Sequence, residues 1–307
     1  MVRMILVTGA TGTIGRSLVG ELTGRGVPFR ALVRSAAKGA ELGCDHVVGD
    51  FDDPDSITAA LTGVDRLFLN STGVTAGPGE QPIARRQRTV IDAAVRAGVS
   101  AVVKVSVWKP RHGGKLALGA HWEAERHLRA SGLDWAVLQP TGFMQNFVTG
   151  AALVTEDGDI LGAYGDAGVA YVDCRDIAAV AAELLTGTRW NEDFALTGPE
   201  AIDHRHIAAR LSAVTGRTIR YVDLPPDELA ARLTGQGLPA DFAADIAELF
   251  AEVGAGAQDT TTTTVRDVTG RDPRTFERFL ADHADLLAVR GTEAASRSTG
   301  QSLVQDS

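Results

Sequence analysis

The chain has 307 residues, of which 44% are hydrophobic and 22% charged, and its mean hydropathy is +0.01; such a composition predicts a soluble globular protein with a sizeable core. A net charge of −9 argues against a nucleic-acid surface, and the lack of a long apolar run argues against a membrane span. The first residues show no signal-peptide cleavage site, and the two cysteines, Cys44 and Cys174, have no CxxC partner, so a reducing cytoplasm is the expected location.

Short apolar runs alternate with segments of helical periodicity through the first half of the chain. The apolar runs predict strands over residues 3–8, 28–34, 45–50, 65–70, 101–108 and 134–140. The segments between them predict helices over residues 14–25, 55–61, 81–97 and 119–130. Strands that are apolar along their whole length and separated by helices are typical of a parallel sheet covered on both faces. We therefore predict an α/β fold with a doubly wound parallel sheet.

After Pro140 the alternation becomes less regular. Residues 157–168 are polar and glycine-rich, which predicts a loop or hairpin, and residues 169–187 predict a strand, an N-cap at Asp176 and a helix. Further helices are expected over 203–215, 227–253 and 273–283, and an extended segment over 260–265. These features predict a smaller C-terminal α+β region over residues 151–290, followed by a disordered tail over residues 291–307.

Three glycines, Gly9, Gly12 and Gly15, lie between the first strand and the first helix, in "VTGATGTIGRSLV". Gly9 would permit a tight turn, Gly12 the close approach of a pyrophosphate, and Gly15 the packing of the helix against the strand. The free N–H groups at the positive end of the helix would then hold the anion. Because the motif follows a strand and begins a regular alternation, it predicts a dinucleotide-binding Rossmann domain over residues 1–150, with its sheet completed by later segments.

The end of the second strand bears on which dinucleotide is bound. An acidic residue usually stands there and binds the ribose 2′-hydroxyl group, but this chain has Arg34, with Ser35 and Lys38 close by. A carboxylate would repel a 2′-phosphate, whereas an arginine can bind it with two hydrogen bonds. Arg34 therefore favours NADPH over NADH. The alternative is that Arg34 is a solvated surface residue.

Several segments together resemble the NmrA-like branch of the atypical short-chain dehydrogenases: "TGATGTIG", "LVRS", "GDFDDPDSI", "SGLDWAVLQPTGFMQN" and "YVDCRDIAAVAAELL". The resemblance covers about residues 3–285. It implies an NADP-binding Rossmann domain and a smaller C-terminal region that closes over the nicotinamide. That family includes quinone reductases, isoflavone-type reductases, secondary-metabolism reductases and regulators that sense the cofactor without catalysis.

The resemblance also implies roles for residues of this chain. It implies that Arg34 takes the 2′-phosphate, and that Asp50 and Phe51 flank the adenine. The pyrophosphate would be held by the glycine turn, which comprises Gly9, Thr11, Gly12, Thr13, Ile14 and Gly15. Asn70 and Ser71, after the fourth strand, would lie beside the cofactor, and Pro140 to Phe143 would border the nicotinamide.

Standard short-chain dehydrogenases use a serine after the fifth strand and a Tyr-x-x-x-Lys motif on the next helix. Ser106 stands where that serine belongs, but the first tyrosine of this chain is Tyr164, so the motif is absent. His121 and Glu125 have the same four-residue spacing and lie on one helix face. We predict that His121 replaces the tyrosine as proton donor and that Glu125 holds its ring; the alternative is a His–Glu pair on a helix surface. Gln139 stands where relatives often have an arginine.

The segment "WKPRHGGKLALG" is predicted to be a loop that contributes to substrate binding. It carries His112 and Lys115, and its glycines suit a mobile cover over the substrate. Trp108, Phe143 and Met144 either line an apolar substrate pocket or belong to the core. No group of histidines has metal-ligand spacing, so no metal is expected.

The leading hypothesis is an NADPH-dependent oxidoreductase that reduces a small apolar acceptor, such as a quinone, an enone or an aromatic ketone, by hydride transfer. One alternative is a non-catalytic NADP(H)-sensing regulator that binds a protein partner, which the absent Tyr-x-x-x-Lys motif would suit. Another is a biosynthetic reductase or isomerase of a polycyclic metabolite. A small-molecule substrate, no nucleic-acid or membrane partner, and a monomer or homodimer are expected.

Overall fold

A computed structural model describes residues 4–71, 73–76, 81–149, 152–155 and 157–287 of the chain. The expected disordered tail, residues 291–307, lies outside these described residues. The chain forms two compact units. Unit 1 comprises Met1–Pro140, Cys174–Leu196 and Thr264–Arg271, and unit 2 comprises Thr141–Asp173, Thr197–Thr263 and Asp272–Ser307. The expected boundary at residue 150 divides the chain into two consecutive domains, whereas each observed unit is built from several separate stretches of the chain.

Unit 1 is built on a seven-stranded sheet with the strand order β3-β2-β1-β4-β5-β6-β8. All six neighbouring pairs are parallel, which confirms the predicted doubly wound α/β fold. The order reverses between β1 and β4, and a dinucleotide binds at such a point in folds of this kind. The strands are β1 (Ile5–Val7), β2 (Phe29–Val33), β3 (His46–Val48), β4 (Arg66–Leu69), β5 (Ala101–Val105), β6 (Asp134–Pro140) and β8 (Glu192–Leu196).

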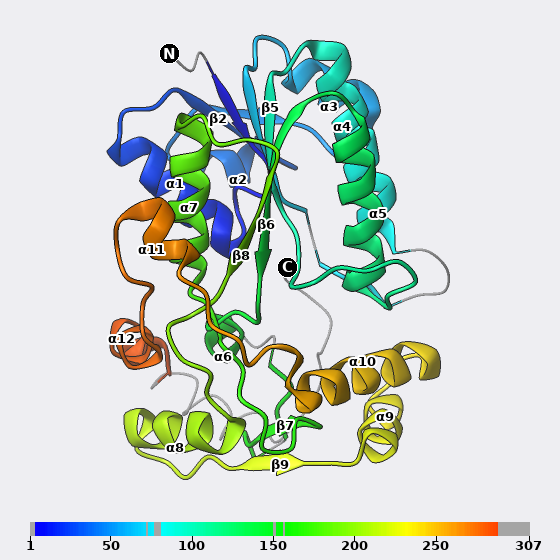
Figure 1. The fold of residues 1–307 in the computed structure, drawn as a ribbon, viewed down its shortest axis with the longest axis vertical. Helices are drawn as coiled ribbons and strands as arrows, with labels where there is room; N and C mark the ends of the chain where they lie inside the picture. Colours follow the sequence, from blue (N-terminus) through cyan, green and yellow to red (C-terminus); the bar gives the residue numbers. More distant parts are fainter. Residues whose placement is uncertain (1–3, 72, 77–80, 150–151, 156, 288–307) are drawn as a thin grey trace. The chain divides into compact units, whose positions relative to one another are not determined.

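Helices cover both faces of this sheet (Figure 1). On one face α1 packs against α7, which in turn contacts α11; on the other face α3 packs against α4, and α4 against α5. The bounds are α1 (Thr13–Gly24), α2 (Ala36–Ala40), α3 (Pro54–Ala60), α4 (Pro82–Ala97), α5 (Ala117–Ala130), α7 (Cys174–Thr186) and α11 (Thr264–Thr269). The core between the sheet and the second group of helices buries Leu6, Leu67, Val102, Ile57, Ile91 and Leu128.

Unit 2 is mainly helical, with one small sheet in which β7 pairs with β9 in parallel. The polar, glycine-rich segment 157–168 contains β7, whose first residue, Ile160, also forms an isolated antiparallel bridge with Val154. Aromatic side chains pack together in this unit's core, where Phe147 meets Tyr171 and Phe276 edge to face. The elements are α6 (Asn146–Thr149), β7 (Ile160–Gly162), α8 (His204–Thr215), β9 (Tyr221–Asp223), α9 (Pro226–Gly235), α10 (Ala240–Glu252) and α12 (Phe276–Asp282).

Two local predictions about helix starts were wrong. Asp176 is not an N-cap, because α7 begins at Cys174 and places Asp176 in its first turn. The segment expected to be extended over 260–265 ends in α11, which begins at Thr264. Threonine favours extended backbone through its branched side chain, but α11 packs against α7 and β8, and this tertiary contact overrides the local preference.

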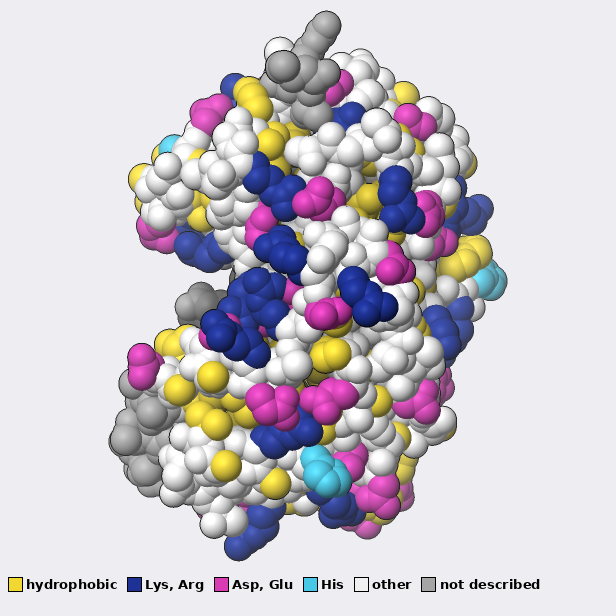
Figure 2. All heavy atoms as spheres, turned by 60° about the vertical axis from the view of Figure 1, so that its left-hand side comes forward, with side chains coloured by type: hydrophobic (Ala, Val, Ile, Leu, Met, Phe, Trp, Pro, Cys, Tyr) yellow, Lys and Arg dark blue, Asp and Glu magenta, His cyan; other side chains and the backbone are white. Residues whose placement is uncertain are grey.

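Charges of both signs are mixed on the molecular surface. On the face that Figure 2 draws, Lys and Arg side chains are interspersed with Asp and Glu. An ion pair links two helices of unit 1: Nη1 of Arg25 in α1 lies 2.9 Å from Oε1 of Glu183 in α7. Within the described part of the chain, every helix is too short or too polar to cross a bilayer.

Candidate active site

The glycine turn joins β1 to α1 in a conformation that needs glycine at two of its three positions. Gly9 has φ +62°, and a Cβ added there would lie 3.1 Å from Nδ2 of Asn70. A Cβ on Gly15 would overlap the carbonyl oxygen of Gly9, so Gly15 lets α1 pack against the turn itself. A Cβ on Gly12 would meet only the Gly9 oxygen, at 3.4 Å. The space in front of Gly12 therefore stays open for the approach of a ligand.

The amino end of α1 offers backbone N–H groups at this turn. Gly12 is the N-cap residue, and because it has no side chain it leaves the first turn of α1 uncapped. Thr8 joins the turn to the end of β4: its hydroxyl donates to the carbonyl oxygen of Asn70 at 2.8 Å and accepts from the Asn70 N–H at 2.9 Å. The positive end of a helix thus lies at the carboxyl ends of two adjacent parallel strands, where a pyrophosphate fits.

Arg34 is an exposed residue directly after β2. Ser35 follows it and caps α2, because its hydroxyl accepts a hydrogen bond from the N–H of Lys38 at 3.4 Å. Among the described residues, neither Arg34 nor Lys38 forms an ion pair through its side chain, whereas Arg16 lies 3.8 Å from Glu41. Within the described part of the chain, two cations without a carboxylate partner therefore stand at the strand end where a cofactor's ribose is expected.

The structure places the other expected cofactor residues on both units. Ser71 is bonded through its hydroxyl to the amide nitrogen of Gln87 at 2.9 Å, and Phe51 packs against the core of unit 1. Asp50 is exposed, and its carboxylate accepts from the N–H of Asp52 at 2.9 Å. The remaining residues are Thr11 and Thr13 in the turn, Ile14 buried in α1, Pro140 buried at the end of β6, and Phe143, a half-buried residue of unit 2.

Two pairs of polar side chains meet between β5 and α5, and all four are buried. Lys104 lies in β5 and Ser106 directly follows that strand, and both side chains bond residues of α5. Nζ of Lys104 lies 2.9 Å from Nδ1 of His121 and donates to the carbonyl oxygen of Val105 at 3.2 Å. The hydroxyl of Ser106 donates to Oε1 of Glu125. The exposed fractions are 0% for Lys104, 2% for Ser106, 9% for His121 and 1% for Glu125.

These contacts differ from the pairing that the helix spacing predicts. Nδ1 of His121 is bonded to Lys104 rather than to Glu125, and neither residue belongs to a solvated surface pair. Glu125 instead accepts from Ser106, from Nη2 of Arg129 at 2.9 Å and from Nε2 of Gln139 at 3.3 Å. The prediction was wrong on this point because the strand beneath the helix supplies partners that the helix sequence does not show.

The buried positions change the protonation of the Lys104–His121 pair. Burial, opposed by the nearby carboxylate of Glu125, lowers the pKa of Lys104 to about 7. Burial and the positive charge of Lys104 hold the pKa of His121 well below its usual range. His121 is therefore a neutral imidazole at neutral pH. The pair holds a proton on Lys104 that it can release near that pH.

Of the predicted substrate residues, two lie on an exposed loop and two are buried. His112 and Lys115 are exposed, and the His112 ring meets the edge of Trp122 with 4.8 Å between ring centroids. Trp108 is 7% exposed and lies under Nζ of Lys109. Met144 is 1% exposed and packs in the core of unit 2, which favours the core alternative for this residue.

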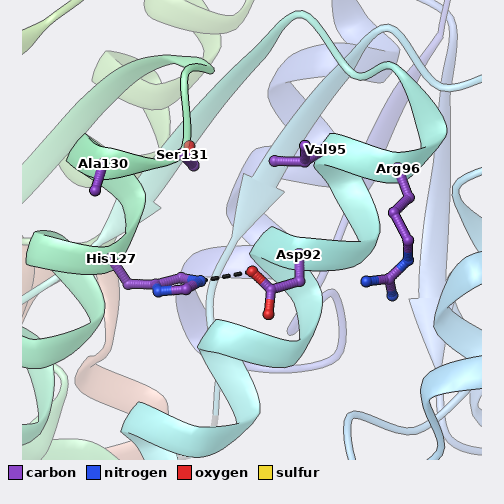
Figure 3. A pocket seen from close by; sticks show the side chains of 6 residues that line it. All are labelled: Asp92, Val95, Arg96, His127, Ala130 and Ser131. Atoms are coloured by element: carbon purple, nitrogen blue, oxygen red, sulfur yellow. Dashed lines mark hydrogen bonds and ion pairs between the residues drawn. The ribbon is translucent and has the colours of Figure 1, made fainter.

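A shallow surface pocket of about 370 Å³ lies between α4 and α5 (Figure 3). It is lined by Asp92, Val95, Arg96, His127, Ala130 and Ser131. Nε2 of His127 lies 2.6 Å from Oδ1 of Asp92, as the dashed line in Figure 3 marks. None of the lining residues is a predicted site residue. His127 thus provides a surface histidine on the same helix as His121.

Lys104 is the functional candidate that the sequence analysis missed. It lies in "AVVKV", which reads as a buried strand, and its neighbours in register, Leu69 of β4 and Val137 of β6, are apolar. A lysine is seldom fully buried unless it is paired, so its place in such a strand was a signal of a buried polar contact. Lysine is also rare in this chain, with four among 30 basic residues.

Residues 1–280 match the NmrA-like family. The NAD(P)H azoreductase of Xenophilus azovorans is 38% identical over 291 residues, which cover 92% of this chain and 98% of that protein. The (4-alkanoyl-5-oxo-2,5-dihydrofuran-3-yl)methyl phosphate reductase of Streptomyces griseus is 38% identical over 296 residues, 93% of this chain and 99% of that protein. The crystal structure of the NADPH-dependent quinone oxidoreductase 2 of Escherichia coli with NADPH matches with a TM-score of 0.77 and 29% identity, covering 91% of this chain and 99% of that one.

The parallel sheet, the glycine turn at its strand-order reversal and these relatives define an NAD(P)H-dependent reductase of the atypical short-chain dehydrogenase type. Within that class, the chain belongs to the NmrA-like family.

Proposed function

We propose that this protein uses NADPH in preference to NADH and reduces small conjugated acceptors that are largely apolar, such as quinones and enones. The observation that carries the cofactor preference is the exposed guanidinium of Arg34 after β2, which pairs with no carboxylate among the described residues. It can bind a 2′-phosphate with two hydrogen bonds, and Lys38 adds a second positive charge. The 2′-hydroxyl of NADH offers neither cation a charged partner.

The turn at Gly9, Gly12 and Gly15 is the proposed pyrophosphate site. The open space in front of Gly12 and the uncapped amino end of α1 fit this group. Bound NADPH would supply a hydride, which carries two electrons, to the acceptor. Asn70, at the end of β4, lies against Gly9 and would help to fix the position of the cofactor beside this turn.

The acceptor class follows from the chemistry that the relatives' names share. An azo compound, an unsaturated lactone that carries an acyl group, and a quinone are all conjugated systems that accept two electrons and two protons. The three proteins differ in the acceptor, and each is a reductase or oxidoreductase by name. We infer that this chain also acts on an acceptor of this kind, and we propose His121 as its proton donor.

The proposal is tested by oxidation of NADPH and NADH at pH 7 against a panel of quinones, cyclic enones and azo compounds. We expect kcat/KM to be at least tenfold higher with NADPH than with NADH. Arg34→Ala should remove this preference, because it removes the bidentate partner of the 2′-phosphate, while kcat/KM with NADH stays within about threefold. Arg278→Ala, which removes an exposed arginine already paired with Asp282 within α12, is the matched control.

Three results would contradict this proposal. If Arg34→Ala leaves the ratio of the two cofactors unchanged, Arg34 is a solvated surface residue. If the wild-type protein binds NADPH but oxidises it with none of these acceptors, the acceptor class is wrong. If NADH is used as well as NADPH, the 2′-phosphate is not recognised.

A further inference from the structure

We propose that Lys104 and His121 form a proton relay in which Lys104 holds the His121 ring in one tautomer and supplies the proton that His121 gives to the reduced acceptor. The inference rests on the proposed reductase function and deepens it. Its basis is the 2.9 Å contact between Nζ of Lys104 and Nδ1 of His121, made by two buried residues from β5 and α5. His121 is the catalytic residue of this relay, and Lys104 acts through it as a positioning residue.

The contact fixes the tautomer of His121. An ammonium group has hydrogen-bond donors and no acceptor, so Nδ1 must offer its lone pair to Lys104. A neutral imidazole then carries its one proton on Nε2. Burial holds the pKa of His121 well below its usual range, which keeps the ring neutral. The protein thus presents a single N–H donor at Nε2.

A neutral imidazole is a weak acid on its own, but it can donate its Nε2 proton if Lys104 protonates Nδ1 at the same time. As the Nε2–H bond breaks and an O–H bond forms on the acceptor, Nδ1 takes a proton from Lys104. One N–H bond of the ammonium breaks, one N–H bond forms at Nδ1, and Lys104 is left as a neutral amine. The acceptor has then gained two electrons with the hydride and one proton through His121. Water returns the proton to Lys104 through the same ring after the product leaves.

The surroundings of Lys104 suit a group that must lose a proton easily. The titratable and charged side chains that face it are His121, Glu125 and Arg129, all from α5, and Arg129 is itself bonded to Asp193 of β8 at 2.7 Å. Its neighbours on β4 and β6 are apolar. Burial therefore dominates and lowers the pKa of Lys104 to about 7, near the pH at which a general acid works best.

Ser106 cannot take the place of His121 as donor in this arrangement. A serine hydroxyl has a single proton to donate, and that proton is directed at Glu125. Arg129 and Gln139 hold the same carboxylate in position. Among the described residues, the contacts of this cluster leave the N–H at Nε2 of His121 for an acceptor oxygen.

The tautomer is tested first, because it needs no acceptor. Protein labelled with ¹⁵N-histidine is studied by two-bond ¹H–¹⁵N correlation NMR at pH 6 and pH 9, in the wild type, in Lys104→Met and in His121→Asn, which assigns the signal. We expect Nε2 to be protonated and Nδ1 to be an acceptor in the wild type at pH 6. Lys104→Met should give a mixture of tautomers. A proton on Nδ1 in the wild type, or a signal that Lys104→Met does not change, would overturn the inference.

The relay is tested second, with two acceptors that differ in their need for a proton. An enone requires protonation as it is reduced, whereas the reduced oxygen of a quinone can take its proton from water. We expect Lys104→Met and His121→Asn to lower kcat with an enone about 100-fold and kcat with a quinone by less than about threefold. In the wild type, kcat with the enone should fall as the pH rises through about 7, because Lys104 loses its proton. His127→Asn, the surface histidine of α5, is the control and should keep both activities.

The outcomes separate this inference from the proposed function. An equal loss with both acceptors would show a structural role for Lys104 and would overturn the relay, as would an unchanged activity with the enone. If the wild type reduces no acceptor, the proposed function fails, and the NMR result then decides only whether Lys104 fixes the tautomer of His121. If Lys104→Met does not fold, His121→Asn and the pH dependence of the wild-type signal carry the same test.

Discussion

Lys104 lies within a strand that is otherwise apolar, and its ammonium bonds two uncharged acceptors, the Val105 carbonyl and the His121 ring. Burial lowers its pKa to about 7, whereas in the unfolded chain it keeps a value near 10.5. Between these two values the unfolded chain binds more protons than the folded protein, so this residue makes the folded state more stable as the pH rises. Below about pH 7 both states are charged, and the folded protein carries the full cost of the buried charge.

We therefore predict that Lys104→Met increases the free energy of unfolding most at low pH. At pH 6 the gain should be about 1–4 kcal/mol, because a buried charge is replaced by an apolar side chain of similar length. The gain should shrink steadily as the pH rises from 7 to 10. Urea unfolding of both proteins at pH 6, 8 and 9.5 measures it. Lys38→Met, at an exposed position, should give a small difference that does not depend on pH; a similar flat response from Lys104→Met would disprove the pKa shift.

The contacts of His121 and Glu125 also show what a sequence pattern cannot predict. The spacing of His121 and Glu125 correctly placed them on one helix face, but it assigned them to one another. The actual partners are Lys104 of β5 and Ser106, which directly follows that strand, and their side chains meet α5. A pattern within one helix cannot show what packs over it, so the contacts of the candidate site needed the three-dimensional structure.

At the scale of elements, α1 and its glycine turn form a unit that the sequence predicted well. A strand, a turn that needs a positive φ at Gly9, and a helix that starts at an uncapped position are all local features. The helix α11 was missed for the opposite reason, since its position depends on contacts with α7 and β8, which are distant in sequence. Local features can be read from a sequence, whereas an element stabilised by distant contacts cannot.

Two glycines of α1 give matched variants with opposite expected effects. Gly15→Ala should lower the free energy of unfolding by about 1–3 kcal/mol, because its Cβ would overlap the Gly9 carbonyl oxygen and push the helix away from the turn. Gly20→Ala meets no atom within 4 Å and should instead raise it by about 0.5–1 kcal/mol through better helix propensity. Urea unfolding measures both. Calorimetry should show weaker NADP⁺ binding for Gly15→Ala alone; similar effects of the two substitutions would argue against the close packing at Gly15.

At the scale of the molecule, unit 1 is assembled from three separate stretches of the chain. The edge strand β8 and the helices α7 and α11 come from beyond residue 170, yet they belong to the unit that holds the glycine turn. Strand and helix periodicity identified these segments along the sequence. Their assignment to one unit depends on tertiary packing, such as the contacts of α7 with α1, β4, β5 and β6.

Cofactor binding should therefore stabilise the folded protein as a whole. A ligand that binds only the folded state adds about 2.7 kcal/mol at one hundred times its Kd, which raises Tm by several degrees. We predict that NADP⁺ raises Tm more than NAD⁺ does at the same concentration, and that Arg34→Ala removes the difference. Differential scanning fluorimetry at pH 7 measures both shifts. Equal shifts for the two dinucleotides in the wild type would contradict the proposed role of Arg34.

The sequence by itself determined the parallel α/β fold and the glycine turn, because both are encoded in short segments: buried apolar strands, amphipathic helices and glycines at a strand end. It also supplied the NmrA-like resemblance that the family match confirmed. Only the tertiary structure decided that His121 meets Lys104 and that Glu125 meets Ser106. Those pairs join residues 17 and 19 positions apart on two elements, and their burial, which sets their protonation, exists only once helix and sheet have packed together.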